Sequence, residues 1–418
     1  MSDTPRGPST IVVDLTPVRA GGENGGAKIL ALGLVSLLAE LAPDSRFIVL
    51  SSQANHQELA RLDAPNMRRF CVDEPAPGRG GLENLALRAR SGLAAFLPPG
   101  ALARAAAVFR RFQRAQGGPS LLQQLGADML FCPFTAPFYD DGITPFVSTV
   151  VDLQSFYLPE LFPTAERERR RREFAQVADH AAGIVCISEY VRETVTAAGA
   201  PPERTTVIYP SFHRRLEAAS LADSPPATVA AWGLLPHRYL LYPANFWRHK
   251  NHAVLIDAFR LFRETAPGSE LKLVLTGAGG TERDRVAQAA AAAGLASRVV
   301  FAGFVPDAQL SALLRFSLAM IFPSRFEGFG MPVLEAMAAG APVLCSNVTS
   351  LPEIAGGAAL LFDPQSPAAI AGAIARIESD GALREQLIQD GLRRAAAFSS
   401  PREMAQSYLD VLRTARRR

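Results

Sequence analysis

Residues 318–346 read LAMIFPSRFEGFGMPVLEAMAAGAPVLCS, and their pattern indicates the fold class of the chain. The apolar runs 318–324 and 341–346 have the length and composition of buried strands, and the segment between them has a helical pattern. A loop, FEGFG, separates the first strand from the helix, and its glycines Gly328 and Gly330 permit close approach of the backbone to another group. Pro332 suits the first turn of a helix. The stretch therefore predicts a strand, a glycine loop, a helix and a second strand parallel to the first.

The same alternation extends in both directions. In the second half we expect strands at 239–244, 271–277 and 298–305, with helices that begin at His252, Glu282 and Asp307. In the first half, TIVVDL (10–15) and RFIVLS (46–51) flank a helix that begins at Lys28. This order predicts two parallel sheets, each with helices on both faces. A chain of 418 residues is also too long for one ordinary core, and two cores imply a cleft between them.

The boundary between the halves is expected near residue 225. Residues 216–236 are rich in Ala, Ser and Pro and show no clear period, which is typical of a linker. We therefore expect an N-terminal Rossmann-like domain over residues 1–225 and a C-terminal domain over residues 226–418. Three helical stretches follow Ser366 and close the chain.

Composition excludes several classes of protein. Hydrophobic residues make up 48%, charged residues 20%, and the net charge is +3, which argues against disorder and against general nucleic-acid binding. The cysteines form no C-x-x-C pair, so neither a zinc site nor a disulfide framework is indicated, and a reducing cytoplasm fits best. No apolar run reaches the roughly 18 residues of a spanning helix. The N-terminus, MSDTPRGPST, lacks the pattern of a secretion signal.

Two segments are rich in arginine. The first, 82–116, is helical in pattern but broken at Pro98 and Pro99, and two interpretations stay open. It is either a peripheral contact with the inner face of an anionic membrane or a solvated helix pair packed on the N-terminal domain. The second, ERERRRRE (166–173), favours a solvated helix face.

The loop FEGFGMPVLE (326–335) has the features of an anion site. A helix N-terminus offers unpaired N–H groups and a favourable dipole, so it can hold a pyrophosphate without a metal ion. Glu335 is suited to accept hydrogen bonds from a ribose diol, although a glutamate there can also merely decorate the helix. Glu327 is placed to sit beside a transferred sugar, where its charge would favour a developing oxocarbenium ion.

A second motif, YPANFWRHKNH (242–252), follows the first strand of the second half. Lys250 is expected to face the phosphates and balance the charge of a departing diphosphate; Arg248 either does the same or points to solvent. His249 and His252 lack a third metal ligand at suitable spacing, so a structural role is favoured. The chain contains no D-x-D pair, which agrees with metal-free phosphate binding.

These motifs resemble family four of the retaining glycosyltransferases, whose GT-B architecture has two facing Rossmann-like domains. The family's E-x7-E signature matches Glu327 and Glu335, its phosphate lysine matches Lys250, and its strand-end G-x-V matches residues 303–305. The resemblance implies metal-independent transfer without a cofactor. It also implies a last helix, about 400–418, that crosses back onto the N-terminal domain. The expected donor-binding residues are Gly25, Gly26, Asn245, Gly277, Phe304, Val305, Gly328, Phe329, Gly330, Met331 and Glu335, and the expected catalytic residues are Glu327, Lys250, Arg248 and Asp152.

The first half resembles the family less tightly. GGENGG (21–26) is similar to a glycine loop that faces the donor phosphates, and IVCISEYVRE (184–193) to a strand followed by Ser-Glu at a helix start. With residues 147–162 it looks most like bacterial transferases of surface-polysaccharide synthesis, many of them mannosyltransferases. One position departs from the family, because Val151 stands where a histidine normally precedes Asp152. Either Asp152 or another loop covers that role, or the sugar is unusual, or activity has been lost.

The leading hypothesis is therefore transfer of a hexosyl unit, with mannosyl as one candidate, from a GDP- or UDP-linked sugar to a hydroxyl of a glycan or polyprenyl-linked acceptor. The family's retention is attributed to a front-face reaction without an obligatory protein nucleophile. The alternative, motivated by Val151, is a non-catalytic subunit that binds a nucleotide sugar or glycan. A GT-B epimerase or phosphorylase is a third interpretation.

Overall fold

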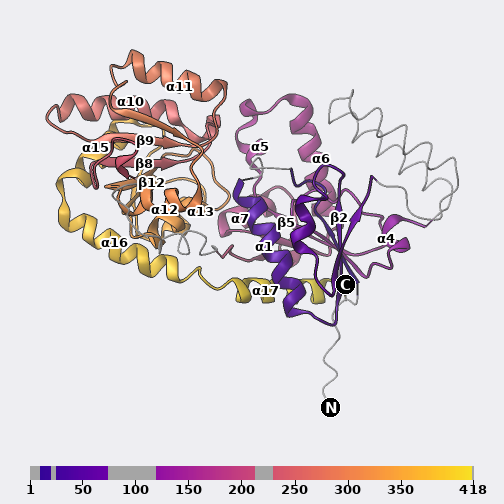
Figure 1. Ribbon diagram of the computed structural model, residues 1–418. Coiled ribbons are helices and arrows are strands. Elements are labelled where there is room, and N and C mark those ends of the chain that lie inside the picture. Colours follow the sequence, from indigo (N-terminus) through magenta and orange to yellow (C-terminus); the bar gives the residue numbers. More distant parts are fainter. Residues whose placement is uncertain (1–9, 20–24, 74–118, 212–228, 417–418) are drawn as a thin grey trace.

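The computed structural model describes residues 10–19, 25–73, 119–211 and 229–416, and these form two parallel sheets with helices around each (Figure 1). The predicted α/β fold is confirmed. The expected linker residue 225 and the arginine-rich segment 82–116 lie outside the described residues.

The first sheet has seven parallel strands in the order β3-β2-β1-β4-β5-β6-β7. Its inner strands are apolar and almost continuously buried, as expected for a parallel sheet covered on both faces, whereas the edge strands β3 and β7 are only partly buried. The strands are β1 (Thr10–Asp14), β2 (Arg46–Ser51), β3 (Met67–Cys71), β4 (Met129–Cys132), β5 (Phe146–Val150), β6 (Gly183–Cys186) and β7 (Thr205–Val207).

The helices of this half lie on both faces of its sheet. One core joins alternate strand residues such as Ile11 and Val13 to α1 and α17, while Val12 belongs to the core that contains α6 and α7. This alternation follows from the period of two along a strand. The helical elements are α1 (Gly25–Leu41), η1 (Glu58–Leu62), α4 (Leu121–Gln124), α5 (Gln154–Tyr157), η2 (Pro159–Leu161), α6 (Thr164–His180), α7 (Glu189–Ala197) and η3 (Pro202–Arg204).

The second sheet has six parallel strands in the order β10-β9-β8-β11-β12-β13. Counted along this half, the order is 3-2-1-4-5-6, so the direction of winding reverses between β8 and β11. In open α/β sheets a ligand binds beyond the carboxyl ends of the strands at such a reversal. The strands are β8 (Tyr239–Pro243), β9 (Lys272–Thr276), β10 (Val299–Gly303), β11 (Ala319–Phe322), β12 (Val343–Ser346) and β13 (Leu360–Phe362).

Helices of the second half pack in two groups: α10 contacts α11 and α15, and α13 contacts α14 and α16. The helical elements are η4 (Arg248–Lys250), α10 (His252–Thr265), α11 (Thr281–Ala292), α12 (Asp307–Arg315), α13 (Met331–Ala338), α14 (Leu351–Ala355), α15 (Pro367–Ser379), α16 (Gly381–Ala396) and α17 (Pro401–Ala415).

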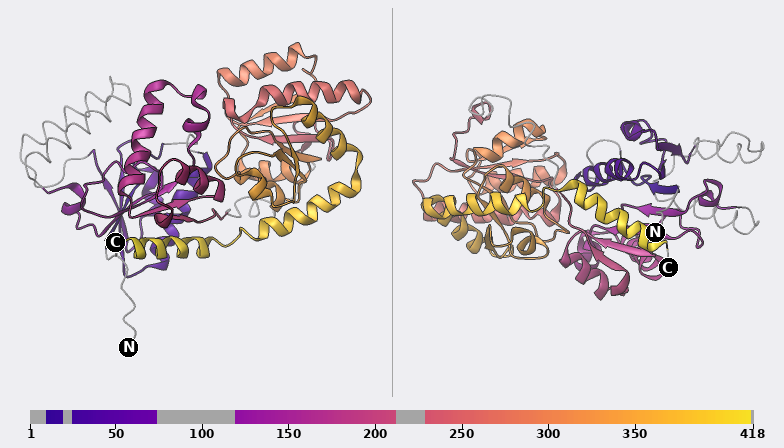
Figure 2. Two further views of the ribbon diagram at one scale, coloured as in Figure 1. Left: turned by 180° about the vertical axis from the view of Figure 1, so that it is seen from behind. Right: turned by 90° about the horizontal axis from the view of Figure 1, so that it is seen from below.

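The last two helices connect the halves. Helix α16 packs on α13, where Gly391 lets the helix approach Met337, and the chain then runs beneath both sheets to α17 (Figures 1 and 2). Helix α17 packs on α1, β5 and β6 and buries Tyr408 against Phe131. The C-terminal helix therefore lies on the first half, while the chain that leads to it belongs to the second. No helix among the described residues is long and apolar enough to cross a membrane.

Candidate active site

Two loops meet at the reversal point of the second sheet. The loop after β8 contains η4 and ends at Lys250, and the loop after β11 contains Glu327. The Lys250 Nζ atom donates to Glu327 Oε1 at 2.5 Å, and both side chains are largely buried, at 11% and 13% exposure. The structure thus brings together the two charged residues that the sequence analysis placed on separate motifs.

The backbone around Lys250 is fixed by its neighbours. Asn251 adopts the left-handed conformation, with φ 64°, and its side-chain amide donates to the carbonyls of Pro323 and Pro364 at 3.1 and 2.7 Å. The Tyr242 hydroxyl donates to the Lys250 carbonyl at 2.6 Å. Because Pro323 directly follows β11, the bond to its carbonyl ties the lysine loop to the strand that leads to Glu327.

The glycine loop leads into α13 as expected. Gly330 precedes the helix with φ 104°, and Pro332 occupies its first turn. Glu335 is 8% exposed and Met331 is half-buried. Phe329 is buried and packs edge-on against Phe398. This contact holds the glycine loop against the segment between α16 and α17.

Two residues that sequence reasoning missed support the loop from the segment after β12. Thr349 accepts a hydrogen bond from the Glu327 N–H at 3.2 Å. The buried Ser350 hydroxyl lies 3.0 and 2.9 Å from the carbonyls of Glu327 and Phe329, to either of which it can donate. The signal in the sequence was the polar run NVTS directly after the predicted strand 341–346, at the same edge of the sheet.

Asp152 approaches this pair from the first half. It follows β5, and its Oδ1 atom accepts from the Gln154 N–H at 2.9 Å. Burial raises the pKa of the Asp152 carboxyl, while the nearby charges of Lys250 and Glu327 act in opposite directions on it. Three of the four expected catalytic residues, Asp152, Lys250 and Glu327, are therefore close enough to interact electrostatically.

Gly328 has a role that the sequence analysis did not foresee. A Cβ atom at this position would overlap the Val151 carbonyl oxygen and would lie 3.3 Å from the Asp152 Cβ. Because glycine has no side chain, the two halves can touch at this point. This contact is separate from any exposure of the Gly328 amide to a ligand. The contact uses the backbone of Val151, so it does not depend on which side chain stands there.

The loops after β8, β9 and β10 also join each other. A Cβ at Gly277 would lie 2.9 Å from the Asn245 Cα, and the Asn245 side-chain oxygen accepts from the Ala278 N–H at 3.0 Å. The Gly277 N–H donates to the Gly303 carbonyl at 2.7 Å. Beyond Gly303, Phe304 is 79% exposed. The structure thus brings these three loops together and uses the side-chain oxygen of Asn245 for an internal hydrogen bond; Val305, the last residue of the strand-end motif 303–305, is buried.

The remaining expected residues are less closely connected. Arg248 is exposed. Gly25 and Gly26 begin α1, with open space where a Cβ would stand, and the rest of the glycine loop, 20–24, lies outside the described residues.

Of the two histidines of the lysine motif, His252 is buried and His249 is half-buried. Burial first, and then the positive charge of Lys250, lowers the pKa of His249 to about 4 and that of His252 to about 3. The His252 ring stacks on Phe246 and lies tilted beside Tyr242, with centroids 4.5 and 4.7 Å away. Within the described part of the chain, no group of three or more metal-ligating side chains is found.

Sequence comparisons relate this chain to known proteins. Residues 234–394 match the family model described as glycosyl transferases group 1. The O-antigen chain mannosyltransferase B of Escherichia coli is 32% identical over 255 residues, which are 60% of this chain and 66% of that protein. A serotype-specific mannosyltransferase, WbdA of Escherichia coli, is 33% identical over 166 residues, or 40% of this chain and 20% of that protein. The chain thus spans less than two thirds of these relatives.

Solved structures match nearly the whole chain. The Anabaena protein Alr3699/HepE in complex with UDP and glucose has a TM-score of 0.69 and 18% identity over 97% of this chain and 99% of that one. A glycosyltransferase from Rickettsia africae has a TM-score of 0.68 and 13% identity over 97% and 98%. Identities this low establish the fold alone. Together with the sequence matches, they show that the chain has the GT-B glycosyltransferase fold and resembles bacterial surface-polysaccharide mannosyltransferases.

Proposed function

We propose that this chain transfers a hexosyl unit from a nucleoside-diphosphate sugar to a hydroxyl of a glycan or polyprenyl-linked acceptor, with retention of anomeric configuration. The observation that carries the proposal is the meeting of Lys250 and Glu327 beside the N-terminus of α13, at the reversal point of the second sheet. The mannosyltransferase relatives make GDP-mannose the first donor to test, and the UDP complex of a neighbour makes UDP-sugars the second.

Each residue has a role that its position supports. Lys250, with Arg248, balances the charge on the departing diphosphate, which the amides near Gly330 also bind, without a metal ion. Glu335 binds the ribose, and Glu327 binds the transferred sugar. The bound sugar must therefore replace Lys250, at least in part, as the hydrogen-bond partner of Glu327. Asp152 contacts the sugar from the other half, where the family has its histidine–aspartate pair. Residues Gly25, Gly26, Asn245, Gly277, Phe304, Val305, Gly328, Phe329 and Met331 complete the donor site.

The acceptor and the place of reaction follow from the relatives in the same way. O-antigen chains are surface polysaccharides, so the proposed acceptor is a growing glycan, at the cytoplasmic side of the membrane. We propose that segment 82–116 contacts that membrane. Nucleic acid is not among the proposed partners.

The first test is ligand binding. A ligand that binds the folded state at 100 times its dissociation constant adds about 2.7 kcal/mol of stability, which a thermal melt detects. We expect one of UDP, GDP and ADP, and one of their sugars, to raise the melting temperature. If none does so at millimolar concentration, the donor site is refuted.

The second test is turnover. Purified protein with each donor that binds should release nucleoside diphosphate slowly by hydrolysis, and faster with a suitable acceptor, as followed by mass spectrometry. Glu327→Ala should abolish both, whereas Glu264→Ala, an exposed glutamate on α10, should change neither. Donor binding without turnover under any acceptor would favour the alternative function, a non-catalytic subunit, which the replacement of histidine by Val151 motivates.

A further inference from the structure

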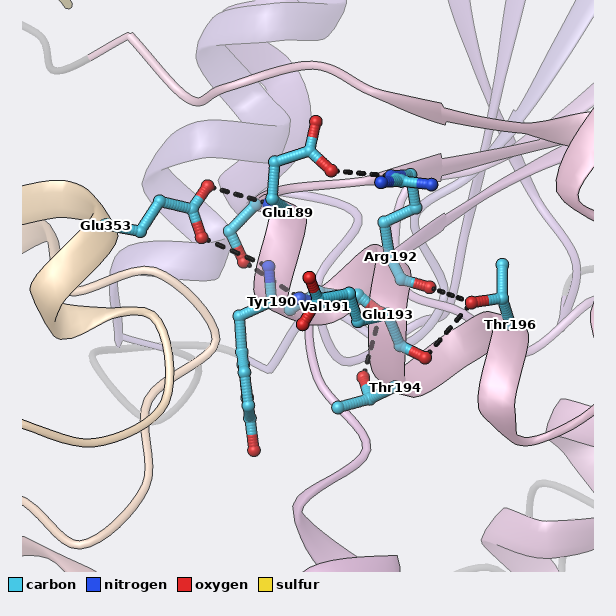
Figure 3. Close-up of polar contacts among 9 residues, drawn as sticks. Glu189, Tyr190, Val191, Arg192, Glu193, Thr194, Thr196 and Glu353 are labelled. Carbon is cyan, nitrogen blue, oxygen red and sulfur yellow. Dashed lines mark hydrogen bonds and ion pairs between the residues drawn. The ribbon is translucent and has the colours of Figure 1, made fainter.

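The first turn of α7 is completed by a residue from the other half of the molecule. Glu353 in α14 accepts hydrogen bonds from the N–H groups of Glu189 and Tyr190, at 2.7 and 3.1 Å, one on each carboxylate oxygen (Figure 3). The first N–H groups of a helix have no partner within it, and a carboxylate there also meets the favourable end of the helix dipole. Glu353 therefore caps a helix whose sequence lies 164 residues away.

The N-cap residue of the same helix reaches in the opposite direction. Ser188 is fully buried, and its Oγ atom accepts from the Val191 N–H at 3.1 Å. The same hydroxyl donates to the Gly328 carbonyl at 2.7 Å. One serine thus caps α7 and holds the backbone of the loop that carries Glu327.

Aromatic contacts surround these bonds. Phe326 lies between Tyr157 and Tyr190 of the first half, with ring centroids 5.9 Å away in each case. Tyr209 of the first half packs against Phe329, with ring centroids 6.4 Å apart. Burial first, and then a hydrogen bond with Glu353, raises the pKa of the Tyr209 phenol to about 12.

The second half holds Glu353 in place through its backbone. Arg394 in α16 donates to the carbonyls of Glu353 and Ile354 at 2.6 and 2.9 Å. The carboxylate is therefore presented by a fixed backbone, so substitution of the Glu353 side chain should leave the local fold of α14 intact.

We propose that Glu353 and Ser188 form an interdomain latch that positions the donor loop, residues 325–331, when the two halves are closed. Glu353 contacts α7 and Ser188 contacts the loop, so neither needs to touch the donor. Both bonds, and the close approach of Gly328 to Val151, exist together only when the halves are docked. Their loss should let the halves separate and let Glu327 leave its position beside Asp152. The effect on catalysis rests on the proposed function, whereas the latch itself does not.

Hydrogen–deuterium exchange tests the latch without any assay of activity. In Glu353→Ala, the amides of Glu189 and Tyr190 lose their acceptors and should exchange at least about tenfold faster, because a hydrogen bond to a charged group is worth at least that factor. Ser188→Ala should speed exchange within residues 326–331. Both variants should increase the radius of gyration measured by small-angle X-ray scattering. Two exposed positions of the second half, Glu385→Ala and Ser379→Ala, serve as controls with the same substitutions.

Turnover and binding then separate positioning from donor contact. We expect kcat to fall about tenfold or more in Glu353→Ala, and less in Glu353→Gln, which keeps one acceptor oxygen. The dissociation constant of the nucleoside diphosphate should stay within about twofold of the wild-type value, because Glu353 bonds to α7 and the proposed donor contacts of Lys250 and Glu335 lie in the second half.

The outcomes are distinct. Unchanged exchange and scattering in both Glu353→Ala and Ser188→Ala would overturn the latch. Faster exchange with an unchanged kcat would overturn the positioning role. Structural changes in the variants of a wild-type protein that turns over no donor would support the latch and refute the proposed function.

Discussion

Removal of the Lys250 charge gives the sharpest test of the candidate site. The Lys250 Nζ and Glu327 Oε1 atoms are 2.5 Å apart, which corresponds to an attraction of about 7 kcal/mol at an effective dielectric constant of about 20. Loss of hydration of both charges offsets most of this attraction, so the pair adds little net stability. A single substitution is different, because it leaves the other charge without its partner.

Removing one partner of a buried pair costs about 3–5 kcal/mol. Both side chains keep some exposure, 11% and 13%, so we take the lower limit of that range. For a domain of about 200 residues, about 3 kcal/mol lowers the melting temperature by roughly 6–12 °C. We expect this loss for Lys250→Met, measured by urea unfolding at pH 7.

The double variant Lys250→Met/Glu327→Gln supplies the decisive comparison. It removes both charges and keeps side chains of similar length, so it should be more stable than Lys250→Met alone. The coupling free energy from the full cycle should be about 2 kcal/mol. Two results would refute the hypothesis that these charges are desolvated and stabilise each other. One is a loss of less than about 1 kcal/mol of unfolding free energy for Lys250→Met, and the other is additive losses in the double variant.

Three further predictions concern the residues around the pair. Gly328→Ala places a Cβ against the Val151 carbonyl, so it should cost about 2 kcal/mol of unfolding free energy and raise the radius of gyration; an unchanged radius would show that the loop yields instead. Asn251→Ala should cost about 1–2 kcal/mol more than Asn251→Gly in urea unfolding, because both lose the two side-chain bonds but only alanine bears the strain of the left-handed backbone. The lowered pKa of His252, about 3, means that the unfolded chain binds a proton below about pH 6.5 and the folded chain does not. The stability that this difference provides is therefore fully present above pH 6.5 and is lost as the pH falls toward 3, at about 1.4 kcal/mol per unit. His252→Phe keeps an aromatic ring and should reduce the slope of stability against pH by that amount between pH 6 and 4.

Local patterns predicted much of both sheets. Strands, helices and the glycine loop depend on the residues next to them in sequence, so TIVVD, KLVLT and the Gly330–Pro332 helix start could be recognised from composition and period alone. The meeting of Lys250 and Glu327 could also be anticipated, because both loops follow strands of one parallel sheet.

The contacts between the halves could not be predicted in this way. Ser188 meets Gly328 across 140 residues, and Glu353 meets Glu189 across 164. Each residue had an adequate local explanation, since serine is a common N-cap and glutamate is common in a first turn. A local pattern does not distinguish a glutamate that serves its own helix from one that caps another.

At position 151, the side chain suggests a changed site, whereas the backbone makes a contact that does not depend on the side chain. The sequence marks this position as a departure because a histidine is expected there, and a changed side chain suggests a changed site. In the structure, the part of Val151 that meets the donor loop is its carbonyl oxygen, which lies where a Cβ of Gly328 would stand. That contact is the same for valine and for histidine, and the adjacent Asp152 still interacts with Glu327 and Lys250. The replacement at Val151 therefore leaves the docking of the two halves intact and removes one imidazole from the site. For this reason, the effect of Val151 should be sought in the choice of donor sugar, whereas the effects of Ser188, Gly328 and Glu353 should be sought in how the halves close.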